Sequence, residues 1–547
     1  MKRALIYFHT LRNLKSQQIV MQIWYRIKPV HRVSISKKSC PPLREIKQHW
    51  RNLIYKSPSL TAPCTFRFLN HEVAYKKEDD FWHDQQQSKL WQYHLHYFDI
   101  LHEQEASITS EDKLVLMQHW IEHNPMGKGI GWNSYPISLR IVNWIKWHLL
   151  GNALNQPLLE SLWQQACFLR QRMEYHILGN HLFENIKALL FTGLFFQGKK
   201  ADTLFDRAQR QFIQQLHEQV LADGAHFELS PMYHALILEG VLDVIQLYQR
   251  FAIAIPPLYI DKAKQMLTWL SSMIHPDGDF AFFNDTTLQM APTYRMLCDY
   301  ASALHIEIES PLSFSLLHEH SGYGAFDLGI AALKIDAAEV GSVYQPGHAH
   351  ADTLSFELSL FQQRVLVNSG ISTYVPSELR LQQRATAAHN TLQCDEQNSS
   401  QVWSAFRVAK RAHIVNRSFK IEKNFIQIIA AHNGYRDLPG SPIHQREWQL
   451  TQSGLTIVDT LTGLFHHEVN VYYHFHPKVT VTIKNNIIRL TLSNGQEITM
   501  QVFADVTLQA SHFYSEFGRA IPNKTICVNS KGILPLEIIC EMKWPGF

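Results

Sequence analysis

The hydrophobic pattern of the chain changes its period near residue 320, and this change constrains the fold more than any other feature. From about residue 85 to 310, apolar residues recur at helical spacing, as Leu114, Met117 and Ile121 do on one predicted helix face. Farther along, apolar and polar residues alternate, as in "LSFEL", which is typical of a β-strand with one buried face. Helices in series followed by strands in series indicate separate layers or domains, not an alternating βαβ sheet.

The strand-rich half also contains a strong hairpin signal. Asn494-Gly495 stands between the two alternating runs of "LTLSNGQEITM", where a tight turn needs positive φ. We find no repeat and no low-complexity linker, so the two halves are expected to pack together, with a ligand in the cleft between them. The predicted divisions are an N-terminal extension over 1–85, a helical domain over 86–312 and an antiparallel β domain over 313–547.

Composition excludes some functional classes and favours others. The 547 residues include 51 basic and 48 acidic ones, and this balance gives no sign of a nucleic-acid binder. The seven cysteines are scattered without a CxxC pair, so neither a disulfide framework nor a zinc knuckle is indicated. Histidine is abundant, with 31 residues against 24 glycines, which raises the odds of acid/base or metal chemistry.

The first 28 residues are basic but do not have the pattern of a cleaved signal peptide. Polar residues interrupt their apolar stretch, and no small-residue cleavage site follows. The longest apolar run, Ala188 to Phe196, is far shorter than the roughly 20 residues of a membrane span. The sequence therefore predicts a cytoplasmic protein without a transmembrane segment, whose amphipathic N-terminus can lie on a surface.

Two polar clusters fall at predicted helix starts in the helical half. In "GNHLFEN", an offset of three places His181 and Glu184 on one helix face behind Asn180, which alternatively only caps the helix. In "SPMYHALILEG", Tyr233 and His234 follow a Ser-Pro pair that opens a helix. A tyrosine at such a point is either catalytic or an ordinary interface aromatic.

Two further clusters fall in the β half. "PGHAHADTLSFEL" puts His348, His350 and Asp352 at alternate positions, which on a strand would share one face and need polar partners if buried. "RATAAHNTL" adds Arg384 and His389 in a stretch with little hydrophobic pattern. These side chains bind a metal, act on a substrate, or satisfy one another inside the fold.

A cupin-type metal site is a rival explanation of the His-x-His pair. Such a site needs a glutamate four or five residues after the second histidine. Leu354 and Ser355 occupy those positions, and Glu357 alternates onto the strand face opposite His350. The spacing therefore disfavours a cupin.

The order of these motifs along the chain resembles that of the heparinase II/III-like polysaccharide lyases, to which the heparin-sulfate and oligoalginate lyases are related. "LWQYHLHYFD" and "WNSYPISLRIVNWIKW" resemble the helical half of that family, and Gly347 to Thr391 resembles the centre of its β domain. The resemblance covers most of the chain. It implies an α+β multidomain fold, in which an incomplete α/α toroid precedes an antiparallel β-sandwich and the active site lies between them.

The activity that the resemblance implies sets chemical requirements on the site. A uronic acid polymer is cleaved without water when the C5 proton is removed and the glycosidic oxygen at C4 is expelled. Because the carbanion would add charge beside an anionic carboxylate, neutral donors or a cation must spread the enolate charge. A base must also reach C5, and an acid must reach the leaving oxygen.

The resemblance assigns these roles to particular residues. Asn180, together with Glu184 if protonated, would hydrogen-bond the carboxylate. Tyr233 would be the general acid and, for one sugar epimer, also the base. His181 and His348 are the candidates for the base and for the polarising partner of the tyrosine, and the choice depends on the geometry at C5.

Four more residues are predicted to support the tyrosine or to contact the sugar chain. A phenol has a reference pKa of about 10, so Tyr233 needs a cation or an imidazole nearby to act as a base at neutral pH. His234 or Arg384 can supply that group. Tyr135 and Arg140 are the predicted substrate contacts in the aromatic-rich helical half.

The resemblance also implies one buried structural zinc ion held by two histidines and an aspartate. The corresponding positions are His350, Asn368 in "VLVNSG", and His389. Asparagine can coordinate through its carbonyl oxygen, but it is neutral and a weaker zinc ligand than a carboxylate. Asp352 is therefore a candidate substitute ligand, or a group that supports the ligands.

The predicted function is a lyase that cleaves an acidic, uronic-acid-containing polysaccharide by β-elimination. A uronate C5-epimerase, which returns the proton to the opposite face, is the near alternative. A second alternative is a non-catalytic glycan-binding or capsule-assembly protein, because a degradative lyase is normally exported and no signal peptide is recognisable. The expected partner is an acidic polysaccharide or oligosaccharide, the family resemblance implies a periplasmic location, and the oligomeric state is left open.

Overall fold

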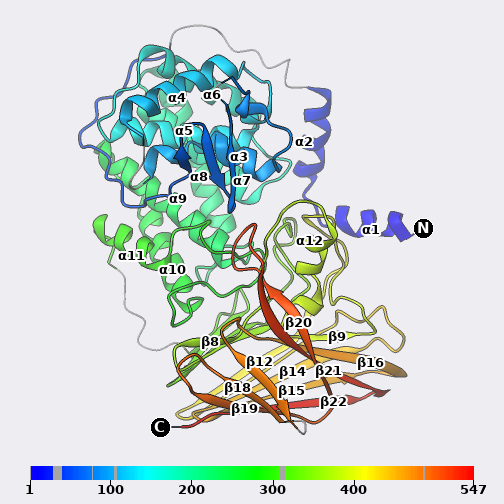
Figure 1. Cartoon of the computed structure of the whole chain (residues 1–547). Coiled ribbons are helices and arrows are strands. Elements are labelled where there is room, and N and C mark those ends of the chain that lie inside the picture. Colours follow the sequence, from blue (N-terminus) through cyan, green and yellow to red (C-terminus); the bar gives the residue numbers. More distant parts are fainter. Residues whose placement is uncertain are drawn as a thin grey trace.

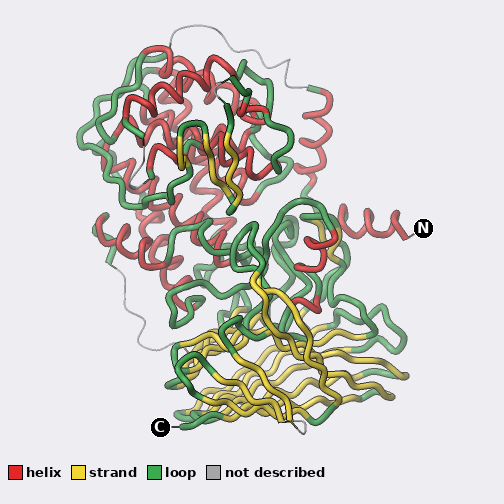
Figure 2. Tube along the Cα trace, in the orientation of Figure 1, coloured by secondary structure: helices red, strands yellow, loops and turns green. Residues whose placement is uncertain are grey.

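The chain folds into a helical part followed by a β part. The computed structural model describes residues 2–28, 40–76, 78–103, 108–307, 315–484 and 487–546. Figure 1 shows the helices gathered at one end and the large sheets at the other, and Figure 2 shows that loops dominate the junction between them. The predicted change from helices to strands is therefore confirmed, with the first strand of the β part beginning at Ser315.

Several helices begin where local sequence rules place them. The Asn155 side chain accepts from the Leu158 N–H at the start of α6, and Ser230 accepts from the Tyr233 N–H at the start of α9, each with a proline in the first turn. None of the described helices is long and apolar enough to cross a membrane. The helices are α1 (Lys2–Leu11), α2 (Ser16–Ile27), α3 (Lys89–Tyr97), α4 (Ser110–His123), α5 (Ser134–Leu149), α6 (Gln156–Gln171), α7 (Gly179–Phe195), α8 (Lys199–Gln219), α9 (Pro231–Arg250), α10 (Pro257–Ser272), α11 (Tyr294–Ala303) and α12 (Glu378–Gln383).

Helix α7 lies at the centre of the helical part. It packs against α5, α6, α8 and α9, and nearly every one of its side chains is buried. This position explains why "ALLFTGLFF" has no polar face, since a helix enclosed on all sides is apolar all round. The start of α7 is thereby held rigidly by its neighbours.

Three antiparallel sheets form most of the β part. One has the order β4-β5-β6-β7-β8, a second β12-β13-β14-β15-β22-β19-β18-β17, and a third β20-β21-β16-β9. Smaller sheets join β1 to β3 and β10 to β11. The strands are β1 (Leu60–Ala62), β2 (Thr65–Phe68), β3 (His71–Ala74), β4 (Ser315–Leu317), β5 (Tyr323–Leu328), β6 (Ala331–Asp336), β7 (Phe356–Leu360), β8 (Gln363–Leu366), β9 (Leu392–Cys394), β10 (Val402–Trp403), β11 (Arg407–Val408), β12 (Ile414–Glu422), β13 (Phe425–His432), β14 (Ile443–Thr451), β15 (Gly454–Thr462), β16 (His466–His474), β17 (Thr480–Lys484), β18 (Ile487–Thr491), β19 (Glu497–Val502), β20 (Asp505–Phe513), β21 (Ile521–Ile533) and β22 (Leu536–Lys543).

The large sheets enclose a single apolar core. Phe356 of β7, Trp448 of β14 and Val471 of β16 all belong to one buried cluster, although they come from three different sheets. Side chains of β14 alternate between buried and half-buried, as a sheet with one covered face requires. The hairpin predicted from Asn494-Gly495 is confirmed, with Gly495 at φ 82° and its N–H donating to the Leu492 carbonyl.

The histidine-rich segment before β7 is a loop and not the strand that its alternation suggested. Pairing begins only at Phe356, and both faces of β7 are buried. Glu357 and Ser359 are buried because each bonds His275 from the helical part, at 2.9 and 2.7 Å. The polar face of this strand therefore contacts the helical part. The loop that precedes the strand lies at the junction of the two parts.

Candidate active site

The candidate site lies where the first turns of α7 and α9 meet the loop before β7. Asn180 comes from α7, Tyr233 from α9 and His348 from the loop. The His348 imidazole stacks on the Tyr233 phenol, with ring centroids 3.8 Å apart and an angle of 28° between planes. Asn180 Nδ2 lies 3.5 Å from His348 Nε2. Three of the four predicted catalytic side chains are thus brought together.

Glu228 holds Asn180 in position. Its Oε1 accepts from the Asn180 backbone N–H at 2.8 Å, its Oε2 accepts from Asn180 Nδ2 at 2.9 Å, and Oε2 lies 3.5 Å from His348 Nε2. A carboxylate at this helix start is favoured by the unpaired N–H groups there. Gly179 makes the approach feasible, because a Cβ at this position, with φ +56°, would lie 2.2 Å from Glu228 Oε1.

Asp285 fixes the orientation of His348. Its Oδ2 lies 2.9 Å from His348 Nδ1, and Arg380 binds its two oxygens at 2.6 and 2.7 Å. Burial would raise the pKa of Asp285, but the guanidinium and two neighbouring histidines hold this pKa well below its usual value. Because an ionised carboxylate only accepts hydrogen bonds, His348 Nδ1 carries the hydrogen and the lone pair lies on Nε2. Nε2 is therefore the atom of His348 that can act as a base.

Tyr374, from the loop before α12, completes the ring cluster. Its hydroxyl lies 3.1 Å from the Tyr233 hydroxyl, and its ring centroid lies 6.1 Å from that of His348. Burial raises the pKa of both phenols well above the usual value. Both phenols therefore stay neutral at neutral pH, and Tyr233 is suited to donate a proton.

His181, the fourth predicted catalytic residue, is paired with a carboxylate. Its Nδ1 lies 3.1 Å from Glu174 Oε1, and its ring centroid lies 4.5 Å from that of Tyr135. Burial disfavours the charged imidazolium, but the Glu174 anion outweighs burial, so the pKa of His181 is raised. The side chain is 27% exposed, which leaves it accessible to a ligand. A histidine whose protonated form is favoured is better suited to bind an anionic sugar than to remove a proton.

Glu184 is engaged by a cation of its own helix. Lys187 Nζ lies 2.7 Å from Glu184 Oε2 and 2.9 Å from Oε1, and both side chains are buried. Burial raises the pKa of Glu184, and Lys187 opposes this shift. The carboxylate is thus used in a buried ion pair, and its contact with a substrate stays a prediction.

The structure commits three of the predicted substrate contacts to hydrogen bonds with backbone carbonyls. His234 bonds the Met266 carbonyl at 2.9 Å, and Arg384 donates to the Ala349 carbonyl at 2.8 Å. Arg140 donates to two backbone carbonyls and stacks on Trp120. All three side chains are fully buried, so His234 and Arg384 do not act on the Tyr233 hydroxyl, and Arg140 does not face a sugar. Each side chain is hydrogen-bonded to backbone carbonyls inside the protein.

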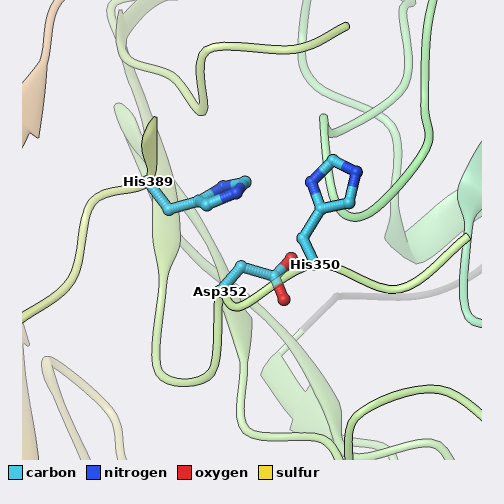
Figure 3. A group of neighbouring side chains, drawn as sticks. All are labelled: His350, Asp352 and His389. Atoms are coloured by element: carbon cyan, nitrogen blue, oxygen red, sulfur yellow. The ribbon is translucent and has the colours of Figure 1, made fainter. Parts of the chain in front are cut away.

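A second cluster, drawn in Figure 3, consists of His350, Asp352 and His389. A ligand atom from each lies within 4.8 Å of the others, and all three residues are buried. His350 Nε2 bonds Asp285 at 2.8 Å, whereas His350 Nδ1 and both ring nitrogens of His389 have no hydrogen-bond partner. Burial raises the pKa of Asp352 to about 6. Two imidazoles that each have a nitrogen without a partner, together with a carboxylate, are a donor set that fits zinc.

Asn368 lies beside this cluster, but its amide has partners. Its Oδ1 accepts from the Asn390 N–H at 3.3 Å, and its Nδ2 donates to Ser355 Oγ at 3.4 Å. Asp352 supplies the carboxylate that the resemblance leads one to expect at position 368. Coordination by Asn368 stays a prediction, and Asp352 is the acid that the structure brings to the two histidines.

Two sequence profiles of one family match most of the chain. "Heparinase II/III N-terminus" matches residues 56–306, and "Heparinase II/III-like, C-terminal" matches residues 313–541. The chain belongs to the heparinase II/III-like family.

Curated relatives of this heparinase II/III-like chain are similar at low identity. A heparin-sulfate lyase from Bacteroides stercoris is 23% identical over 355 residues, which cover 60% of this chain and 51% of the relative. One from Pedobacter heparinus is 24% identical over 315 residues, which cover 51% of this chain and 47% of the relative. The chain thus spans about half the length of these two relatives.

Solved structures of heparinases share the fold. A crystal structure of heparinase III superposes with a TM-score of 0.71 at 18% identity, over 86% of this chain and 81% of the other. A heparan sulfate lyase mutant from Pedobacter heparinus gives 0.63 at 18% identity, over 88% and 81%. These matches confirm the predicted architecture of a helical toroid followed by an antiparallel β-sandwich.

Four residues of this heparinase-like site were not among the predicted ones: Glu228, Asp285, Tyr374 and Arg380. Glu228 was visible in the "HFELSPMYH" stretch but had no assigned role. Asp285 and Arg380 lie 63 and 32 residues from His348 in the sequence, and neither stands in a pattern that predicts their pairing. Only the tertiary fold brings them together.

Proposed function

We propose that this chain is a polysaccharide lyase that cleaves a uronic-acid-containing polysaccharide by β-elimination. One observation carries the proposal: the His348 imidazole, with Nδ1 fixed by Asp285, stacks at 3.8 Å on a neutral Tyr233 phenol beside the Asn180 amide. A base, an acid and a neutral donor are the three groups that the reaction requires. The names of the two curated relatives described above, each a heparin-sulfate lyase, support the same reaction class.

The proposed reaction begins at His348 Nε2, whose lone pair takes the proton from C5. The C5–H electrons pass into the substrate carboxylate as an enolate and then form the C4=C5 double bond as the C4–O bond breaks. The Tyr233 hydroxyl gives its proton to the leaving oxygen, and a proton from the His348 imidazolium afterwards restores the phenol. The short ring separation allows both groups to reach adjacent atoms of one sugar.

The enolate charge requires donors on the carboxylate. Glu228 holds one side of the Asn180 amide, so the second amide hydrogen, near His348 Nε2, is the one offered to the substrate. Glu228 itself adds negative charge, and we assign the compensating cation to His181, whose raised pKa favours its protonated form. Tyr135, in ring contact with His181, would line the same wall.

The proposed enzyme also holds one divalent metal ion, with zinc as the best fit. His350, Asp352 and His389 would bind it, because their unpaired nitrogens and buried carboxylate match its ligand preferences. Bound zinc would supply charge neutralisation and rigidity to the loop that carries His348. No step of the elimination passes through it.

The epimerase alternative is disfavoured by the placement of the two proton-transfer groups. Epimerisation needs groups on opposite faces of C5, whereas Tyr233 and His348 lie side by side. The deciding experiment incubates the protein with a panel of heparan-like, alginate-like, hyaluronan-like and capsular polyuronates in heavy water. Ultraviolet absorbance of a 4,5-unsaturated sugar supports the lyase, and deuterium at C5 without cleavage supports the epimerase. If neither product forms, both fall, and the non-catalytic glycan-binding alternative remains.

A further inference from the structure

Helix α2 has its polar and apolar faces reversed relative to an ordinary surface helix. Gln18 is buried and donates to the carbonyls of Ile177 and Tyr344 in the body of the protein. The opposite face exposes a continuous apolar stripe at helical spacing, with exposed fractions between 41% and 62%: Ile19, Val20, Ile23, Trp24 and Ile27. A helix in water normally buries such a stripe, so this face is suited to bind something apolar.

Helix α1 repeats the arrangement. Its Thr10 points inward and accepts from Trp403 Nε1, while Leu5, Phe8 and Leu11 are 50%, 60% and 51% exposed. In Figure 1 both helices lie on the outer side of the molecule, at the level of the junction and above. Among the described residues, nine of the 27 exposed large apolar side chains fall within these two short helices. Such a concentration exceeds ordinary scatter of apolar residues over a surface.

The charge of this segment has the opposite sign to that of the remaining chain. Residues 1–44 contain ten of the 51 basic residues and no acidic one. Residues 45–547 therefore carry 41 basic against 48 acidic residues. A basic amphipathic segment on an otherwise acidic protein is electrostatically complementary to an anionic surface.

A pocket at the junction of α1 and α2 provides a place for one anionic group. It has a volume of about 300 Å³, and its lining includes Arg12 and Arg411 together with His413 and Glu339. Glu339 is already paired with His413 at 2.9 Å, whereas the buried Nε of Arg411 has no hydrogen-bond partner. Burial and the adjacent Arg12 lower the pKa of Arg411 to about 10. A phosphate between the two guanidinium groups would satisfy both.

We propose that α1, α2 and the pocket at their junction form a docking surface for an anionic phospholipid bilayer, with a headgroup phosphate between Arg12 and Arg411. The apolar stripe enters the acyl boundary while the basic residues face the headgroups, as in interfacial amphipathic helices. Gln18 donates to the carbonyls of Ile177 and Tyr344, which lie three residues before Asn180 and four residues before His348. Docking therefore holds the candidate active site close to the membrane surface.

The test is flotation of the full-length protein with phosphatidylcholine vesicles, with and without phosphatidylglycerol. We expect binding to the anionic vesicles only, and loss of most of it in high salt. Exchange of Ile19, Ile23 and Ile27 for glutamate should lower the partition coefficient by about tenfold or more. Arg12→Gln should lower it by a smaller factor, on the order of fivefold, since one basic residue near such a surface contributes about 1 kcal/mol.

A matched control separates the surface from the change in net charge. Exchange of Val115, Phe503 and Ile533 for glutamate adds the same charge at exposed apolar positions elsewhere and should leave vesicle binding unchanged. Thermal melts of both triple variants check folding. If the wild-type protein stays with the unbound fraction and light scattering shows a dimer that the first triple variant loses, a second copy covers this face and the proposal is overturned. Equal binding by both triple variants overturns it too.

Discussion

His348 and His350 lie two residues apart in one loop and bond the same carboxylate, yet they belong to different sites. Asp285 Oδ2 accepts a hydrogen bond from His348 Nδ1 at 2.9 Å, and Asp285 Oδ1 accepts one from His350 Nε2 at 2.8 Å. The free nitrogen of His348 then faces Asn180 and Glu228. The free nitrogen of His350 has no partner and belongs to the candidate metal cluster.

The two histidines are therefore distinguished by which ring nitrogen bonds Asp285, and not by their positions in the sequence. Asp285 bonds Nδ1 of His348 and Nε2 of His350. The nitrogen left free is therefore Nε2 in His348 and Nδ1 in His350. Burial lowers the pKa of His350 to about 4, so this ring is neutral and available as a metal ligand. Asp285 thereby couples the order of the candidate metal cluster to the position of His348, the proposed base.

The largest expected loss of stability comes from Asp285→Asn, which removes the group that both histidines share. The variant leaves the Arg380 guanidinium buried without its anion, and loss of one partner of such a pair costs about 3–5 kcal/mol. Urea unfolding should show this loss, and polyuronate cleavage should fall by about 100-fold or more because His348 loses its orientation.

Asp277→Asn is the matched control for this variant. Asp277 also binds an arginine, Arg364, but its side chain is 38% exposed. Solvent can replace the lost anion there, so the cost should stay below about 1 kcal/mol. Equal losses for the two variants would contradict the central role of Asp285.

Tyr233→Phe tests the catalytic side of the comparison alone. The variant keeps the ring that stacks on His348 and removes the hydroxyl, so the free energy of unfolding should change by about 1 kcal/mol or less. Cleavage should fall by about 10²–10⁴-fold, the usual contribution of a general acid. Zinc content, measured by mass spectrometry, should stay the same.

Tyr374→Phe provides the comparison for this hydroxyl. Tyr374 bonds Tyr233 at 3.1 Å but does not stack closely on His348, so its loss should reduce cleavage much less than loss of the Tyr233 hydroxyl. An unchanged rate for Tyr233→Phe would remove this residue from the mechanism.

Asp352→Asn and Asn368→Ala test which side chain completes the metal site. If Asp352 is the ligand, its exchange should lower zinc affinity by on the order of 100-fold, whereas Asn368→Ala should leave affinity nearly unchanged. Isothermal titration of the metal-free proteins measures this difference. The reverse order of effects would identify Asn368 as the ligand. In the wild type, removal of zinc by a chelator should lower Tm, because bound metal stabilises only the folded state.

The sequence predicts residue clusters better than it predicts partners. Tyr233 is visible because Ser230 and Pro231 mark a helix start, whereas Asn180 and His348 are visible because polar residues cluster in their segments. The start of α7 has no capping side chain, since its N-cap position is Leu178. Asp285 and Arg380 are not visible in the sequence. Nothing near either residue indicates that Asp285, in a loop, will pair with Arg380 on α12. The alternation in β7 was misleading for a similar reason, because the second face is covered by the helical part.

Three polar residues, two in the helical half and one in the β half, show the opposite error. Arg140, His234 and Arg384 have the chemistry of substrate contacts, but burial commits them to backbone carbonyls. Residue type alone does not distinguish a guanidinium that binds a sugar from one that satisfies the interior.

The smallest expected effect concerns His181, whose pKa is raised, in contrast to the lowered pKa of His350. Because Glu174 raises this pKa in the folded protein, the pair stabilises the fold fully below the unfolded pKa of about 6.5, and this stabilisation is lost as pH rises through the folded value. Glu174→Gln should therefore reduce the free energy of unfolding more at about pH 6 than at about pH 9. The wild-type affinity for an acidic oligosaccharide should weaken over the same rise in pH, and that of the variant should change less.

Glu339→Gln, which breaks an exposed pair with His413, serves as the control and should show little pH dependence, since solvent screens that pair. A difference between wild type and Glu174→Gln that does not vary with pH would mean that Glu174 acts on His181 only through packing, and His181 would lose its role as the cation that receives the sugar carboxylate.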